Sequence, residues 1–330
     1  MSLTLRFLGT SGSRPTVERN VSSIALVREG ETLLIDCGEG TQRQMMRYGV
    51  SFTLSDILFT HLHADHILGL LGLLRTMRLG GRTEPMRLWG PPGLAKFVQR
   101  AEALNGERWG FPVESTELAP WTPVQRSGYK IVPYPADHHG AKAFGYSFVE
   151  EIRLGRFHPD MARGYGIPEG PLWGRLHRGE SVTLDDGRTI DASILVGPSR
   201  PGRHVVITGD TRPTESTVTA ALGADLLVHE STFGDDEAAR AIETGHSTAR
   251  EAATVALRAV VRRLILTHFS ARYARESAEL DAQAREIFPA TSCARDGLEV
   301  DVPFVEETQV NPTASPPPAP ASTAGTVSTT

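Results

Sequence analysis

One hexapeptide constrains this chain more than any other part of its 330 residues. It reads His61-Leu62-His63-Ala64-Asp65-His66, so four side chains that can bind a metal ion fall within six positions. A strand-like segment at 57–60 precedes it directly, and alternate residues of an extended chain share a face, so the first two histidines can face one ion. The loop that follows can turn the aspartate and the last histidine toward a second ion. An exposed histidine cluster is the alternative, and it does not explain the position at a strand end.

Further ligands are expected at other strand ends, because six positions cannot complete two tetrahedral sites. Asp210 follows an apolar run, and its two carboxylate oxygens could bridge two ions. His268 ends another apolar run, and either His138 or His139 could complete the remaining site. Imidazole and carboxylate suit zinc, with manganese or iron as alternatives, and the chain's two cysteines are too few for a cysteine cage.

Short apolar strands alternate with helices along the chain. Strands are predicted at 3–8, 23–27, 32–36, 56–60, 130–133, 204–208, 225–229 and 263–268, with a hairpin at 183–190. Helices are predicted at 41–48, 68–79, 93–104 and 249–261, the last opened by a capping box of Thr248 and Glu251. A strand-rich stretch followed by helices occurs twice. This order favours an α/β fold with two sheets packed face to face and helices outside, an αββα sandwich.

Composition divides the chain into a folded region, residues 1–308, and a tail, residues 309–330. The tail consists of uncharged residues rich in Pro, Ala, Ser and Thr, which predicts disorder. No apolar run is long enough to cross a bilayer, and the N-terminus lacks the features of a signal peptide. A cytoplasmic protein without membrane contact is therefore expected.

The segment from about 152 to 178 differs in composition from the rest. It contains five arginines against two carboxylates, a net charge of +3 in a chain whose net charge is −5. Glycines and prolines separate the aromatic residues Phe157, Tyr165 and Trp173. A basic and flexible insertion of this kind, which we call the arm, suits the phosphates and bases of folded RNA. An ordinary long surface loop is the alternative.

Six short motifs lie outside the arm and the hexapeptide. They are Phe7-Leu8-Gly9-Thr10-Ser11, Arg19-Asn20-Val21-Ser22-Ser23, Asp36-Cys37-Gly38-Glu39-Gly40-Thr41-Gln42, His229-Glu230-Ser231-Thr232-Phe233, His246-Ser247-Thr248 and Leu266-Thr267-His268-Phe269-Ser270-Ala271-Arg272-Tyr273. With the hexapeptide, they resemble the bacterial tRNase Z family of the metallo-β-lactamase superfamily, over about residues 3–304. The resemblance implies the metallo-β-lactamase fold, two zinc ions and an endoribonuclease that cleaves the 3′ trailer from precursor tRNA.

The same resemblance implies how the ligands divide between the two ions. His61, His63, His139 and Asp210 would hold one zinc, and the other would be held by Asp65, His66, Asp210 and His268. His139 is preferred to His138 because the stretch 139–146 matches the family in register. Adjacent residues of an extended chain point in opposite directions, so only one of these two histidines should face inward.

The reaction also requires groups that orient the nucleophile and protonate the leaving 3′ oxygen. Asp65 would orient or deprotonate the nucleophile in addition to binding metal. His246 precedes a predicted helix and is not needed as a ligand, so it is the candidate general acid, with Glu230 holding its imidazole in the charged form. The products would be tRNA with a 3′-hydroxyl and a trailer with a 5′-phosphate.

The arm carries a further part of the resemblance. Residues 166–171 resemble the arm with which the family clamps the tRNA body, and in the family this arm serves the site of a dimer partner, so a homodimer is implied. Two positions depart from the family: Val17 replaces a usual lysine, and Leu154-Gly155 replaces Pro-Gly. Another hydrolase of this fold, such as a β-lactamase, an arylsulfatase or a small phosphodiester hydrolase, would need no RNA clamp. A non-catalytic RNA-binding homologue would lack a ligand, and none is missing.

Overall fold

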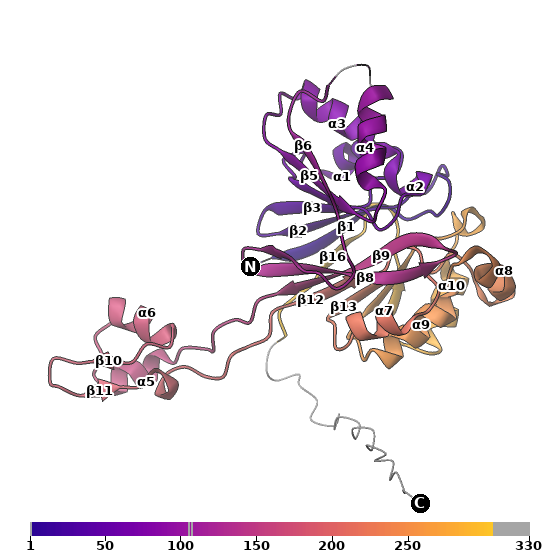
Figure 1. Cartoon of the computed structure of the whole chain (residues 1–330). Helices are drawn as coiled ribbons and strands as arrows, with labels where there is room; N and C mark the ends of the chain where they lie inside the picture. The colour runs from indigo at the N-terminus through magenta and orange to yellow at the C-terminus, as the bar shows by residue number, and fades with distance from the viewer. Residues whose placement is uncertain (1, 105, 107, 306–330) are drawn as a thin grey trace, which may run out of the picture.

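The computed structural model describes residues 2–104, 106 and 108–305, which are built around two seven-stranded sheets (Figure 1). The first sheet contains β1 (Leu3–Gly9), β2 (Ser23–Arg28), β3 (Glu31–Ile35), β4 (Asp56–Leu58), β5 (Met86–Gly90), β6 (Val113–Glu117) and β16 (Glu299–Asp301). The second contains β7 (Val124–Arg126), β8 (Tyr129–His138), β9 (Ala141–Glu150), β12 (His204–Ile207), β13 (Leu226–Glu230), β14 (Leu264–Thr267) and β15 (Thr291–Cys293). Their orders are β16-β1-β2-β3-β4-β5-β6 and β15-β14-β13-β12-β9-β8-β7.

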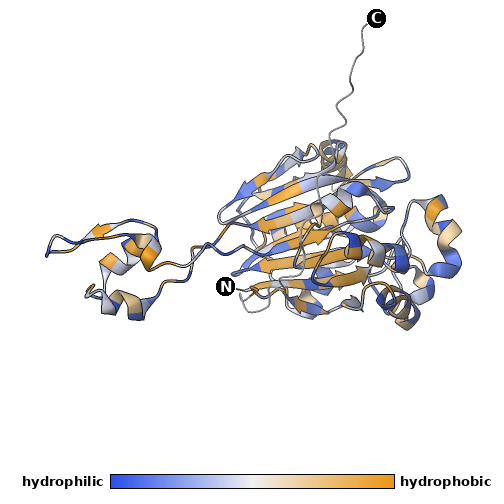
Figure 2. Ribbon diagram, turned by 90° about the horizontal axis from the view of Figure 1, so that it is seen from below, coloured by the Kyte–Doolittle hydropathy of each residue, from blue (hydrophilic) through white to orange (hydrophobic). Residues whose placement is uncertain are grey.

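Helices cover the outer face of each sheet. The first sheet is covered by α1 (Thr41–Tyr48), α3 (Gly69–Leu79) and α4 (Leu94–Leu104). The second is covered by α7 (Glu215–Ala220), α9 (Ala249–Arg258) and α10 (Ala278–Arg285), while α8 (Ala238–Thr244) lies toward one end. One apolar core lies between the sheets and one lies under each helical layer. In Figure 2 the hydrophobic colour follows the strands, as this layering requires. The predicted αββα sandwich is therefore confirmed.

Local patterns located most of the elements that form the sandwich. The helix predicted at 41–48 coincides with α1, and Thr248 and Glu251 make the predicted capping box at the start of α9. Within the sandwich, the prediction missed the strands β5, β6, β7, β9, β15 and β16 and the helices α2 (Ala64–Ile67), α7, α8 and α10. The strand β9 pairs with β8 over its whole length, but Gly145 weakens its sequence signal. A side chain at this position would lie 2.2 Å from the ring of Tyr134, so the close packing of the two strands requires glycine.

The arm differs from the sequence prediction in its extent. It leaves the sandwich after β9, returns to β12, and contains α5 (Pro159–Gly164), α6 (Pro171–His177), β10 (Val182–Thr183), β11 (Thr189–Ile190) and a 3₁₀ turn, η1 (Ala192–Ile194). Isolated bridges pair Arg153 with Arg200 and Phe157 with Val196. The predicted bounds of 152–178 are therefore wrong at the C-terminal end, and the hairpin predicted at 183–190 is part of the arm, which spans residues 153–200.

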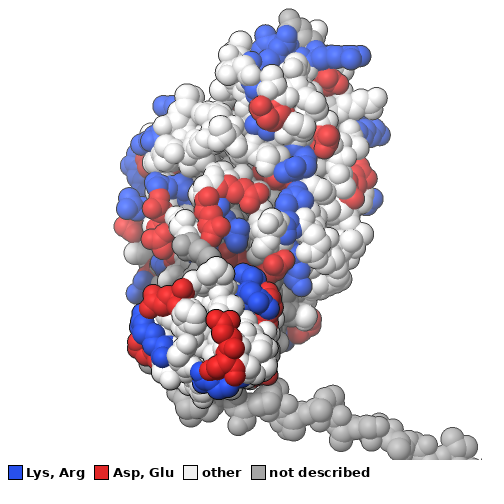
Figure 3. Space-filling model, turned by 90° about the vertical axis from the view of Figure 1, so that its left-hand side faces the viewer, with Lys and Arg blue, Asp and Glu red and all other residues white. Residues whose placement is uncertain are grey.

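A small apolar core makes the arm a folded lobe. It combines side chains from both halves of the segment, namely Ala162, Ile167, Leu176, Val182, Ile190, Ala192 and Leu195. Residues 153–200 hold seven arginines and six carboxylates, a net charge of +1, and four of these arginines form surface ion pairs within the arm. Figure 3 shows both charges side by side on the lobe that faces the viewer. The complete arm is thus only weakly basic.

Two predictions concern parts of the chain that the structure does not test fully. The tail predicted at 309–330 lies outside the described residues. Among the described residues, no helix has the length and apolar character needed to cross a membrane.

Candidate metal centre and active site

Strand ends bring the predicted chemical residues to one end of the sandwich. The hexapeptide follows β4, which runs parallel to β3 and β5, and its second half forms α2 (Ala64–Ile67). Asp210 follows β12, Glu230 ends β13 and His268 follows β14, and these three strands are parallel neighbours. The carboxyl ends of parallel strands meet at one edge, where loops of different sequence origin form a site. His138 reaches the same place from the end of β8.

Side chains that could hold a metal ion meet there in overlapping groups, within each of which the ligand atoms lie within 4.8 Å of one another. Two groups share no member: one contains His61, His63 and His138, and the other contains Asp65, His66, Asp210 and His268. Two further groups include His246, one with His138 and Asp210 and one with Glu230 and His268.

Asp210 faces both groups. Its Oδ1 lies 3.1 Å from Nε2 of His268 and 3.3 Å from Nε2 of His66. Its Oδ2 lies 3.7 Å from Nε2 of His61 and 3.8 Å from Nε2 of His138. This is the geometry expected of a bridging carboxylate, with one oxygen toward each group.

The structure contradicts the choice of His139 over His138. His138 is buried, and its Nε2 lies 3.1 Å from Nδ1 of His63. His139 is exposed and belongs to neither group, because β8 ends at His138 and the chain then turns with a φ of +43° at His139. One of the two histidines is buried and the other is exposed, as expected, but His138 is the buried one, and His139 lies in the turn beyond β8.

Hydrogen bonds on the far side of the rings orient the histidines. Nδ1 of His138 donates to the carbonyl oxygen of Gly245 at 2.9 Å, and Nδ1 of His66 lies 2.7 Å from a carboxylate oxygen of Asp36. Nδ1 of His268 lies 2.9 Å from the hydroxyl of Thr232. A ring that carries its proton on Nδ1 presents the lone pair of Nε2 to the centre, as metal-binding histidines do. Sequence reasoning identified these rings but missed Asp36 and Thr232 as the groups that orient them.

The donor atoms fit a divalent cation. Nε2 of His61 and Oδ1 of Asp210 are buried and have no hydrogen-bond partner among the described residues. Burial, together with the nearby charge of His66, holds the pKa of His61 well below its ordinary value, so this ring is neutral. Burial raises the pKa of Asp210, but His268 and His66 outweigh this effect and hold the pKa well below its usual range. Buried imidazole nitrogens around an ionised carboxylate are a donor set that binds metal, and binding releases any proton that a ring nitrogen still carries.

Asp65 is held by the loop that follows β1. The backbone N–H of Ser13 donates to its Oδ2 at 2.6 Å, and Nε2 of His268 lies 3.4 Å from the same oxygen. Gly12 allows this approach, because a side chain there would lie 2.5 Å from the ring of His268. The loop therefore fixes the carboxylate of Asp65 in its place within the second group.

Glu230 and His246 form a buried pair beside the two groups. Nδ1 of His246 donates to Oε1 of Glu230 at 2.8 Å, and the hydroxyl of Thr232 donates to Oε2 at 2.9 Å. Burial lowers the pKa of His246, but the charge and the hydrogen bond of Glu230 outweigh it and raise this pKa to about 9. The pair that the sequence predicted is therefore brought together, and Nε2 of His246 remains as a donor to a third group.

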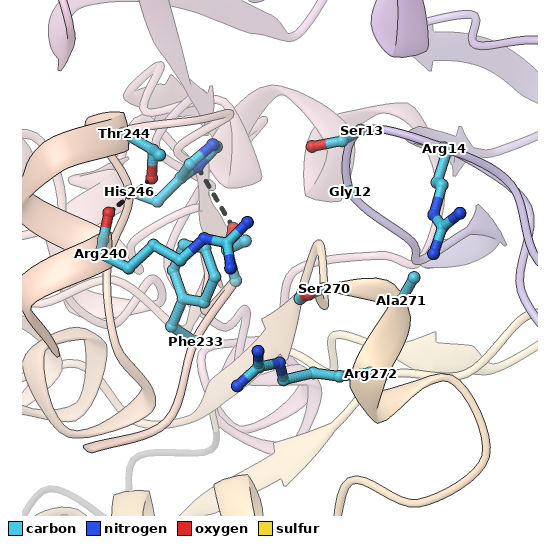
Figure 4. Close-up of a pocket in the computed structure, with 11 residues that line it drawn as sticks. Gly12, Ser13, Arg14, Phe233, Arg240, Thr244, His246, Ser270, Ala271 and Arg272 are labelled. Carbon is cyan, nitrogen blue, oxygen red and sulfur yellow. Dashed lines mark hydrogen bonds between the residues drawn. The ribbon is translucent and has the colours of Figure 1, made fainter. Parts of the chain in front are cut away.

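A cavity of about 600 Å³ opens beside His246 (Figure 4). Three arginines from different segments, Arg14, Arg240 and Arg272, surround it, and no carboxylate lines it. The other lining residues are Gly12, Ser13, Thr232, Phe233, Thr244, Ser270 and Ala271. None of the side chains in the two metal-binding groups lines this cavity, so it lies next to the candidate acid and not between the ligands.

Arg212 joins the loop after Asp210 to the backbone of His246. Its guanidinium donates to the carbonyl oxygen of His246 and, with both nitrogens, to the carboxylate of Glu251. Oε2 of Glu251 also accepts from the backbone N–H of Thr248 at 2.9 Å, within the capping box of α9. Arg212 is thus a positioning residue for His246, and no local sequence pattern singles it out.

The variant Arg212→Gln should lower kcat by about tenfold for a reaction in which His246 protonates the leaving group, because His246 loses a charge-assisted backbone contact. The loss should be smaller for a substrate with an acidic leaving group, and metal content should stay the same. Arg258→Gln is the matched control, since Arg258 makes a similar two-oxygen contact to Glu215 on the exposed outer surface. Parental rates in the Arg212 variant would show that this contact does not position the acid.

Comparisons with known proteins agree with this fold. A family model described as a beta-lactamase superfamily domain matches residues 175–269, and one described as anti-Pycsar protein Apyc1 matches residues 3–106. The crystal structure of human tRNase Z, short form, superposes with a TM-score of 0.67 at 27% identity, covering 91% of this chain and 100% of that one. The metallo-beta-lactamase fold protein YhfI from Bacillus subtilis has a TM-score of 0.65 at 18% identity and covers 91% of this chain and 100% of its own, which supports the fold alone.

Curated relatives extend the similarity to nearly the full length. Ribonuclease Z of Gemmatimonas aurantiaca is 62% identical over 308 residues, which cover 93% of this chain and 98% of that protein. Ribonuclease Z of Myxococcus xanthus is 51% identical over 303 residues, which cover 92% of this chain and 98% of that protein. The chain therefore belongs to the ribonuclease Z family, the tRNA 3′-processing endonucleases of the metallo-β-lactamase superfamily.

Proposed function

We propose that this ribonuclease Z works with two zinc ions and cleaves the 3′ trailer from precursor tRNA. Cleavage leaves a 3′-hydroxyl on the tRNA and a 5′-phosphate on the trailer. The observation that carries the proposal is Asp210, whose two oxygens face two adjoining groups of ligands next to a buried Glu230–His246 pair. Two metals with a proton donor beside them suit displacement of a poor leaving group from phosphorus.

The ligands divide as the geometry suggests. His61, His63, His138 and Asp210 would hold one ion, with His138 in place of the expected His139. Asp65, His66, Asp210 and His268 would hold the other. When bound, zinc would supply Lewis-acid stabilisation of the charge that develops on the scissile phosphate. Manganese or iron could bind the same donor atoms.

The side chains of the protein perform the proton transfers. Asp65, held by the N–H of Ser13, orients the attacking water and accepts a proton from it. His246 donates the proton on Nε2 to the departing 3′ oxygen, while its Nδ1–H remains bonded to Glu230. The carboxylate of Glu230 is fixed by the N–H groups of Thr211 and Thr232, each at 3.0 Å, so it keeps the imidazole oriented and charged.

Precursor tRNA is the proposed partner, and the arm is the proposed clamp. The arm extends from the sandwich on two strand-like segments with a folded lobe at its end, so it can reach RNA far from the metal centre (Figure 1). Residues 166–171 of the lobe carry the resemblance to the arm of the family. We also propose a homodimer in which the arm of one copy serves the site of the other, and this part rests on the family resemblance alone.

Metal analysis tests the ligand assignment. We expect about two equivalents of zinc per chain. Asp210→Ala should lose most of both ions, because Asp210 offers an oxygen to each group. His138→Ala should lose metal and activity, whereas its neighbour variant His139→Ala should keep both, since His139 is exposed. Well under one equivalent in the parent protein, or metal loss in His139→Ala, would contradict the assignment.

A further inference from the structure

We propose that the cavity beside His246 binds the tRNA side of the cleaved strand, and that Arg14 and Arg240 hold the phosphate immediately upstream of the last tRNA nucleotide. This inference rests on the proposed function, because it takes His246 as the group that protonates the 3′ oxygen. The two arginines would be specificity residues for an RNA strand and would not take part in the bond-breaking step.

The charge of the cavity wall points to an anionic ligand. Its lining contains Arg14, Arg240 and Arg272 and no aspartate or glutamate. Arg272 is engaged by the carboxylate of Glu237. Arg240 reaches Glu237 only at 3.8 Å, and within the described part of the chain the side chain of Arg14 has no ion pair or hydrogen bond. Two guanidinium groups are therefore available, and guanidinium binds phosphate through parallel hydrogen bonds.

The direction of the reaction identifies the phosphate. In an in-line displacement the attacking and leaving oxygens lie on opposite sides of phosphorus. The attacking water is oriented by Asp65 among the metal-binding groups, so the leaving oxygen lies on the side of His246. This oxygen is the 3′ oxygen of the last tRNA nucleotide. That nucleotide must therefore occupy the space next to His246, and its own 5′-phosphate lies one nucleotide farther along.

The size and the lining of the cavity suit that nucleotide. A volume of about 600 Å³ lies within the range of small-molecule sites and holds one nucleotide with its phosphate. Ser13, Thr244 and Ser270 offer hydroxyl groups around it. In Figure 4, Arg14 lies on the loop across the hollow from Arg240, so positive charge faces the cavity from two sides.

The first measurement compares Arg14→Gln, Arg240→Gln and the double variant with the parent in cleavage of precursor tRNA. Each single change should raise KM by about tenfold, and the salt dependence of binding should fall by about one log–log unit per lost phosphate contact. The charge-matched control is Arg100→Gln on α4, an exposed arginine on the outside of the first sheet that should change neither quantity. Parental KM values and salt slopes in both single variants would overturn the proposal.

The second measurement identifies which phosphate is bound. A precursor is made with an uncharged methylphosphonate in place of the phosphate directly 5′ of the last tRNA nucleotide. This change should reduce kcat/KM for the parent enzyme about as much as the double substitution does, and the double variant should not respond to it, because both remove the same contact. If the losses in kcat/KM from the methylphosphonate and from the double substitution were additive, this subsite would be excluded. It would also be excluded if a methylphosphonate one nucleotide farther upstream had no effect in the double variant but lowered kcat/KM in the parent. A parent enzyme that leaves the trailer junction uncut would instead refute the proposed function.

Discussion

The variant His246→Ala should lower kcat on precursor tRNA by about 10²–10⁴-fold, the usual contribution of a general acid. The departing group is a ribose 3′ oxygen, which leaves slowly without a proton. Nε2 of His246 is free to supply it, because Nδ1 is bonded to Glu230 at 2.8 Å. Glu230→Gln should cause a smaller loss in the same direction, since the ring then lacks the charge that stabilises its protonated form.

A small diester with a nitrophenolate leaving group separates this role from metal binding. That group needs no proton, so His246→Ala should lose little activity on it. His246 also lies close to possible ligands, with its Nδ1 3.9 Å from Oδ2 of Asp210, so metal content must be measured in the same preparation. Equal losses on both substrates, or loss of metal, would show that His246 is not the acid.

Removal of the arm should lower kcat/KM for precursor tRNA by at least about 100-fold, because the phosphate and base contacts that we propose for the arm would be lost. Hydrolysis of the nitrophenyl diester should remain largely intact, since every metal-binding residue and His246 lie outside residues 153–200.

The structure also defines the end points of the deletion. Arg153 and Arg200 exchange backbone hydrogen bonds of 2.8 and 2.9 Å, and β9 and β12 are antiparallel neighbours, so residues 154–199 can be replaced by a short glycine–serine turn.

A deletion of 153–178 alone is the informative control for folding. It would remove Ala162 and Leu176 but leave Val182 and Ile190 without the other half of their apolar core, so we expect loss of solubility or of thermal stability. The clean deletion should keep the melting temperature and metal content of the parent. If it also binds and cuts precursor tRNA as well as the parent does, the clamp proposal is wrong. Because the whole arm has a net charge of only +1, we expect shape and direct contacts to matter more there than bulk charge.

Local order in the sequence was sufficient to predict the sandwich and most of the centre. His61, Asp210 and His268 each follow a short apolar strand. The strands before Asp210 and His268 belong to one parallel set, whose carboxyl ends meet at one edge, and the strand before His61 joins them because the two sheets pack face to face. The beginning of the arm was predicted as well, because glycines and arginines replace the apolar pattern there. Its end was not, since residues 179–200 have no unusual composition and belong to the arm only through pairing with residues 153–178.

Tertiary structure alone decided which of two adjacent histidines faces the metal groups. The alternation of an extended chain predicts that only one of His138 and His139 faces inward. The pairing of β8 with β9 and the turn after His138 determine which one it is. It also decided the contacts of Arg212, whose partners are 34 and 39 positions away in the chain. A local sequence pattern reflects burial and turn formation over a few residues. Which face of a strand packs against its neighbours, and which partner a polar group finds, depend on segments that are distant in the sequence. These segments come together only when the two sheets pack.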